Sequence, residues 1–89
     1  MGVYYMARNL DKREWFDGSD FEGGIKFSSI THPTANFPRG LALILERGSW
    51  KGNRVEIISD SGTEQDEYYE TEEKWTHTAE AKRLWEENR

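Results

Sequence analysis

Residues Gly48 to Gly62, GSWKGNRVEIISDSG, predict a β-strand between two turns and end where the charge of the chain changes. Val55 and Ile57 alternate with Arg54 and Glu56, as in a strand that buries one face. Glycine, Asn, Asp and Ser on either side favour turns. The stretch contains no nucleophile with a base, no ligand set and no phosphate-binding loop, so it specifies a strand over residues 55–59 and no activity. The turn-forming residues are Gly48, Gly52, Asn53, Asp60, Ser61 and Gly62.

Upstream, residues 3–16, VYYMARNLDKREWF, predict a β-hairpin. Tyr5 and Ala7 fall on one face and Tyr4 and Met6 on the other, because side chains alternate along a strand. Turn-favouring residues follow at Asn9 to Asp11 before the second strand. A further strand is possible over Ile25 to Ile30.

The central segment, NFPRGLALILERG (residues 36–48), fits either a strand or a helix. Consecutive apolar residues between two glycines favour a strand, whereas Asn36 as a cap, Pro38 in the first turn and Gly48 beyond the end favour a helix. Gly40 opposes the helix, since glycine in a helix interior costs about 1 kcal/mol relative to alanine. We expect the helix, with a buried face made of Leu41, Ile44 and Leu45.

The last third of the chain is acidic and ends in an expected amphipathic helix. Residues 60–89 carry ten Asp and Glu against four Lys and Arg, whereas residues 1–59 carry seven against eight. Residues 60–74 are expected to be an acidic connector; within it, DEYYETEE could extend the last helix, form an edge strand or stay loose. A stripe at spacings of three and four predicts a helix that begins near Thr76 or Thr78. The stripe is Trp75, Thr78, Ala81 and Trp85.

These elements predict one compact α+β domain over residues 1–89, with an antiparallel sheet, one short central helix and a C-terminal helix. Cysteine is absent, which excludes disulfides and thiolate chemistry. No stretch approaches the roughly 18 apolar residues of a membrane span, and no signal peptide is readable, so a cytoplasmic location without membrane contact is expected. The net charge of −5 disfavours direct binding of nucleic acid, which rests on Lys and Arg.

The residues that could carry chemistry form no recognisable catalytic or metal-binding motif. His32 and His77 are the two histidines of the chain, and both are expected at the surface or as local caps. The serines lie in no nucleophile motif, and the acidic loops lack the ligand spacing of a calcium-binding loop. We therefore expect no cofactor, no metal and no enzyme activity. A small hydrolase that uses Asp60 or Glu14 with His32 is the weakest alternative.

Surplus aromatic residues beside charged ones indicate a protein-binding surface, because Trp, Tyr and Arg dominate interface energetics. The sequence contains four Trp, four Tyr and four Phe. The leading hypothesis is a non-enzymatic binding or regulatory module with a protein partner and a possible edge-strand homodimer. The alternative is a small acidic inhibitor, of the phage anti-defence or nucleic-acid-mimic type, that occupies the basic groove of a nucleic-acid-processing protein. The candidate interface residues are Trp50, Asp60, Glu64, Asp66, Glu67, Tyr68, Tyr69, Glu70 and Trp85.

The chain resembles a scattered group of small soluble proteins that have a Tyr-rich first strand and a later Trp-x-Gly-[Asp/Asn] before a strand. That resemblance implies no activity, catalytic residue or ligand. The chain departs from the group's common pattern at Asn53 and at Asp60-Ser61-Gly62, where Asp and Asp-Tyr-Gly are usual. The residues that carry the resemblance are Tyr5, Asn9, Lys12, Glu14, Trp50, Gly52, Asn53 and the strand from Val55 to Asp60.

Overall fold

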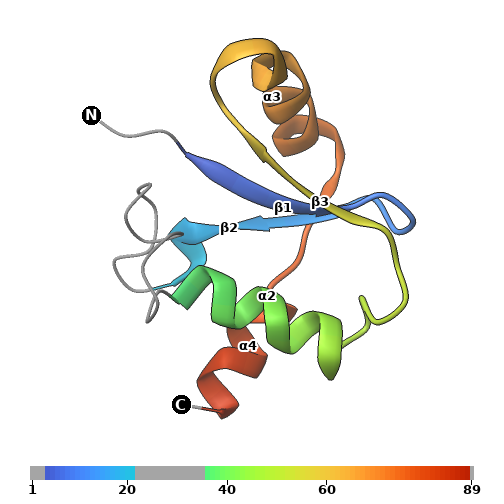
Figure 1. Cartoon of the computed structure of the whole chain (residues 1–89), viewed down its shortest axis with the longest axis vertical. Coiled ribbons are helices and arrows are strands. Elements are labelled where there is room, and N and C mark those ends of the chain that lie inside the picture. Colours follow the sequence, from blue (N-terminus) through green and yellow to red (C-terminus); the bar gives the residue numbers. More distant parts are fainter. Residues whose placement is uncertain (1–3, 22–35, 89) are drawn as a thin grey trace.

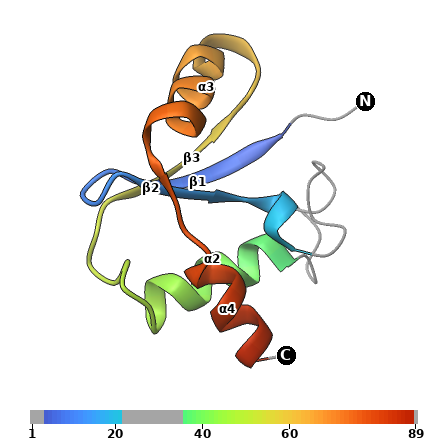
Figure 2. The same ribbon diagram turned by 180° about the vertical axis from the view of Figure 1, so that it is seen from behind.

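The computed structural model describes residues 4–21 and 36–88, which form a mixed β-sheet with helices on both faces (Figure 1). Helix α3 lies on one face, and α2 and α4 lie side by side on the other, as both views show (Figure 2). The predicted α+β class is confirmed. The elements are β1 (Tyr5–Asn9), β2 (Glu14–Asp17), the 3-10 turn η1 (Gly18–Asp20), α2 (Asn36–Glu46), β3 (Val55–Ser59), the 3-10 turn η2 (Gly62–Glu64), α3 (Gln65–Lys74), β4 (Thr76–His77) and α4 (Glu80–Glu87).

The strands of the described sheet follow the order β3-β1-β2-β4. The predicted hairpin is confirmed, because β1 pairs antiparallel with β2, and β3 pairs antiparallel with the other side of β1. The expectation of a purely antiparallel sheet is wrong, since β4 runs parallel to β2. Two backbone bonds fix this pairing: Thr76 N–H donates to the Arg13 carbonyl at 3.0 Å and Thr78 N–H to the Trp15 carbonyl at 2.9 Å.

The fully buried side chain of Asn9 holds the hairpin turn. Its Oδ1 accepts the backbone N–H groups of Asp11 and Lys12, both at 2.9 Å. Its Nδ2 donates to Oδ1 of Asn53 at 2.9 Å. One side chain therefore closes the β1–β2 turn and ties it to the turn before β3, the region that the sequence marked with Gly52 and Asn53.

Strand alternation divides the apolar residues between two clusters, one on each face of the sheet. The larger cluster lies under α2 and α4 and consists of Ala7, Phe16, Phe21, Phe37, Ile44, Trp50, Ala81 and Trp85. The smaller cluster attaches α3 and consists of Met6, Ile58 and Tyr68, with Trp15 packed against it.

The central segment is the helix α2, so the helical alternative is confirmed. Ile44 is fully buried, and Leu41 and Leu45 pack half-buried against the larger cluster, as expected. Gly40 also faces this cluster: a Cβ built on it would lie 2.4 Å from Cζ of Phe21. Glycine is present there because the Phe21 ring fills the space that a side chain needs.

Residues 60–74 were expected to form an acidic connector, but the helix α3 occupies most of this segment. Nor does DEYYETEE extend the last helix: Trp75 is extended at ψ 162°, and β4 intervenes. The C-terminal helix begins at Glu80 and not near Thr76 or Thr78. The possible strand at Ile25 to Ile30 lies outside the described residues. Within residues 4–21 and 36–88, no helix is both long and apolar enough to cross a membrane.

Candidate functional site

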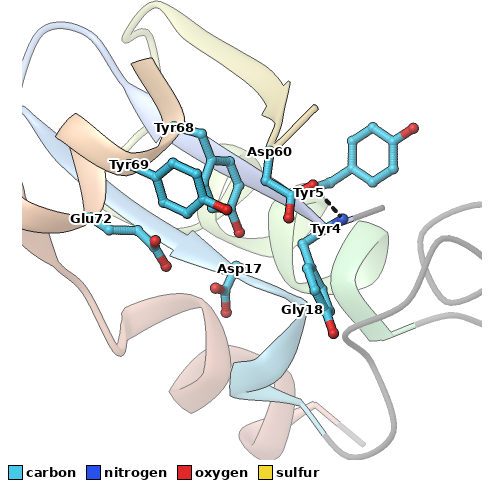
Figure 3. Close-up of a pocket in the computed structure, with 8 residues that line it drawn as sticks. All are labelled: Tyr4, Tyr5, Asp17, Gly18, Asp60, Tyr68, Tyr69 and Glu72. Carbon is cyan, nitrogen blue, oxygen red and sulfur yellow. Dashed lines mark hydrogen bonds between the residues drawn. The ribbon is translucent and has the colours of Figure 1, made fainter. Parts of the chain in front are cut away.

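A pocket of about 350 Å³ opens between α3 and the adjoining ends of β1, β2 and β3 (Figure 3). Eight of the described residues line it, and seven of these are tyrosines or carboxylates. They are Tyr4, Tyr5, Asp17, Gly18, Asp60, Tyr68, Tyr69 and Glu72.

Helix α3 contributes three of these side chains because Tyr68 anchors it to the sheet. Tyr68 is 4% exposed and packs with Met6 and Ile58. Successive helical residues are about 100° apart, so anchoring Tyr68 turns Tyr69 and Glu72 toward one flank of the helix. Figure 3 shows both side chains pointing into the opening.

The remaining walls come from the ends of the strands. Tyr4 precedes β1 and Asp60 follows β3, and the antiparallel pairing of these strands makes the two residues neighbours. The Asp60 N–H donates to the Tyr4 carbonyl at 3.0 Å, and the Tyr4 N–H donates to Oδ1 of Asp60 at 3.1 Å. Asp17 ends β2, where its N–H donates to Oδ2 of Asp20 at 3.2 Å. Strand pairing therefore fixes where these residues lie around the pocket.

The tyrosine rings of the pocket differ in exposure to solvent, from buried to half-exposed. Tyr68 and Tyr69 meet edge to face, with centroids 5.6 Å apart and planes at 82°, which forms a corner of two rings. Tyr69 is 50% exposed and Tyr4 41% exposed, so ring surface remains accessible at the mouth. Aromatic faces carry partial negative charge and attract cations.

The pocket carries an excess of negative charge. Of the lining residues that the structure describes, three are carboxylates and none is Lys, Arg or His. The Glu72 side chain is exposed as a whole, but partial burial of its carboxyl, with the charges of Asp17 and Asp60, raises its pKa. Burial and the same acidic surroundings raise the pKa of Tyr68, so its hydroxyl stays protonated well above neutral pH. The site is suited to stabilise a positively charged group.

The spacing of the carboxylates suits an organic cation better than a metal ion. No three Asp, Glu or His side chains in the described part of the chain gather closely enough to hold a metal together. In the pocket the carboxylates come from three elements, and the rings of Tyr68 and Tyr69 lie between Glu72 and Asp60 (Figure 3). A larger cation can contact rings and carboxylates together.

The structure brings three of the predicted interface residues into this pocket: Asp60, Tyr68 and Tyr69. Trp50 and Trp85 were wrongly expected at an interface surface. In the structure Trp50 is fully buried and Trp85 is only 6% exposed. The indole of Trp50 is paired with a residue distant in the sequence, because its Nε1–H donates to Oε1 of Glu14 at 2.8 Å.

The other predicted acidic residues lie outside the pocket. Glu64 accepts the Ser59 N–H at 3.3 Å, and Glu67 pairs with Arg8 at 2.7 Å. Asp66 and Glu70 are exposed on α3, with Glu70 lying 3.8 Å from Lys74.

The candidate interface residues did not include Tyr4, Tyr5, Asp17 and Glu72, which line the pocket. The one signal in the sequence was the i,i+4 spacing of Tyr68 and Glu72, which places both on one side of a helix. That signal has no meaning until residues 65–74 are known to be helical.

Among the described residues, the structure does not bring together those considered for a small hydrolase. Glu14 accepts the Trp50 indole hydrogen, and His32 lies outside the described residues. His77 is in β4, and its Nε2 lies 2.9 Å from Oδ1 of Asp20.

Neither a scan against protein-family models nor searches of curated proteins and solved structures gives a match to this chain. The geometry of the pocket therefore carries the functional argument.

Proposed function

We propose that the protein is a non-enzymatic binding module that uses this pocket to capture a cationic group of a protein partner. The observation that carries the proposal is the lining: four tyrosines and three carboxylates, with no base among the eight residues. Rings attract a cation through their faces and carboxylates through their charge.

The shape of the pocket favours a side chain presented by a protein. Its mouth has the accessible rings of Tyr4 and Tyr69, whereas Tyr68 is buried beneath. A side chain that projects from a partner can enter while the partner covers these rings, and tyrosine is a frequent source of interface energy. The absence of cysteine suits a reducing compartment, and the proposal includes a cytosolic location.

Affinity capture with matched variants tests this proposal. Tyr69→Ala and Glu72→Gln alter the pocket at exposed positions of α3, so both variants should remain folded. Glu73→Gln is the control, because Glu73 is exposed on the same helix and does not line the pocket. A partner captured by the wild type and the control but lost with both pocket variants supports the proposal; equal capture by all four proteins refutes it.

A specific observation also favours the acidic-inhibitor alternative. Asp66, Glu70 and Glu73 are exposed on α3 at helical spacing, so they present a carboxylate row away from the sheet. Such a row can replace phosphates in a basic groove, with affinity that falls steeply as salt screens the charges. Under this alternative Glu73→Gln should weaken capture as much as Glu72→Gln, whereas Tyr69→Ala should have little effect.

A further inference from the structure

Helix α3 already binds an arginine, on the flank that faces away from the pocket. Arg8 donates from Nη1 to Oγ1 of Thr71 at 2.9 Å and from Nη2 to Oε2 of Glu67 at 2.7 Å. Its Nε donates to Glu56 at 2.7 Å, and its Cζ lies 5.0 Å from the centroid of the Trp75 ring. The side chain is only 11% exposed. Here a guanidinium group is held by carboxylates around it and lies over an aromatic ring.

The pocket repeats this chemistry on the other flank of the helix. Tyr68 and Thr71 form the buried seam of α3, and the helical spacing puts Glu67 on one side of that seam and Glu72 on the other. In the pocket Glu72 therefore provides a carboxylate, as Glu67 does for Arg8, and Tyr69 provides an aromatic ring, as Trp75 does. Asp17 and Asp60 face them from the sheet (Figure 3). Among the described residues that line the pocket there is no Lys, Arg or His.

We infer that the pocket receives the guanidinium group of an arginine that projects from the protein partner; this inference rests on the proposed function. A guanidinium is planar and weakly hydrated, so it can stack on a tyrosine ring while its N–H groups reach carboxylates on different walls. A lysine ammonium is compact and strongly hydrated, and needs acceptors gathered around one point. In this pocket the carboxylates come from different elements: Glu72 from α3, Asp17 from the end of β2 and Asp60 from just beyond β3.

The test is an NMR titration of the 89-residue chain with three probes: N-acetyl-arginine amide, N-acetyl-lysine amide and tetramethylammonium. The arginine probe should bind about threefold to tenfold more tightly than either of the others, with the largest shifts at Tyr69, Glu72 and Asp17. Tyr69→Leu and Glu72→Gln should weaken this binding, and Glu73→Gln should not.

The outcomes of the titration distinguish the arginine inference from the proposed binding of a cationic group in general. Lysine or tetramethylammonium binding in the pocket as tightly as arginine would overturn the guanidinium assignment and leave a pocket for cations in general. Arginine-induced shifts confined to residues outside the pocket would also overturn it. If none of the three probes shifts a pocket residue, both the inference and the proposed cationic ligand are wrong.

Discussion

Arg8 Nη2 lies 2.7 Å from Glu67 Oε2, and this contact joins the central strand β1 to helix α3. The same guanidinium also bonds Thr71, which is 1% exposed. Because α3 carries Tyr68, Tyr69 and Glu72, the Arg8 contacts hold one wall of the pocket in place.

We therefore expect Arg8→Met to reduce the free energy of unfolding by about 2 kcal/mol, since hydrogen bonds to charged groups contribute about 1.5–3 kcal/mol. Amide hydrogen exchange should show the loss first in α3. Lys74→Gln is the comparison, because its pair with Glu70 is exposed on both sides and should contribute less than about 0.5 kcal/mol. Equal effects of the two substitutions would contradict the assigned role of Arg8.

A second prediction concerns the indole of Trp50, which is buried in the larger cluster and bonds Glu14. Glu14→Ala leaves this donor without its acceptor, so we expect a loss of about 1–3 kcal/mol in urea unfolding. Glu14→Gln keeps an acceptor oxygen and should cost less. In a Trp50→Phe background the cost of Glu14→Ala should shrink, because no donor remains; an unchanged cost would show that the bond contributes nothing.

A third prediction separates helix propensity from packing in α2. Gly40→Ala should destabilise the fold by about 1–3 kcal/mol through overpacking, although alanine is the better helix former. The new Cβ would meet the Phe21 ring at 2.4 Å. The mirror substitution Ala42→Gly, at an exposed position of the same helix, should cost about 1 kcal/mol by propensity alone. Thermal unfolding measures both, and a stabilised Gly40→Ala would disprove the close packing.

Several of the helices and strands of this fold could be predicted from the sequence, but the tertiary contacts between them could not. Alternation and turn chemistry identified the hairpin and the strand over residues 55–59, because both signals lie within a few neighbouring residues. Gly40 counted against a helix at α2 because glycine is a poor helix former. The reason for glycine at this position is the Phe21 ring, which is distant in sequence and could not be recognised locally. In the same way, the helical state of residues 65–74 depends on Arg8 and the smaller cluster.

The pocket was partly predictable for the same reason. The sequence drew attention to Asp60, Tyr68 and Tyr69 through their acidic and aromatic character. Asp17 and Tyr4 join them only through strand pairing, which brings together residues far apart in the chain. Trp50 and Trp85 were misplaced because a ring beside charged residues can be wet at its edge or, as here, buried in the core.

The last prediction concerns pH and rests on Glu72, whose pKa is raised by burial and by Asp17 and Asp60. A carboxyl with a raised pKa in the folded state is less favourable when ionised there than in the unfolded chain, so at pH 7 it reduces stability. Glu72→Gln should therefore raise the Tm at pH 7, and the gain should fade as the pH drops through the raised pKa and vanish below the ordinary value of 4.5.

Glu73→Gln controls for the general relief of negative charge at the end of α3 and should give a smaller gain, since Glu73 does not line the pocket. Equal gains from the two variants at pH 7, or a gain that persists at about pH 3.5, would contradict the assigned electrostatics. Glu72→Gln should at the same time lose affinity for the arginine probe. A residue that destabilises the free fold and strengthens ligand binding is expected of a binding site, where stability is sacrificed for function.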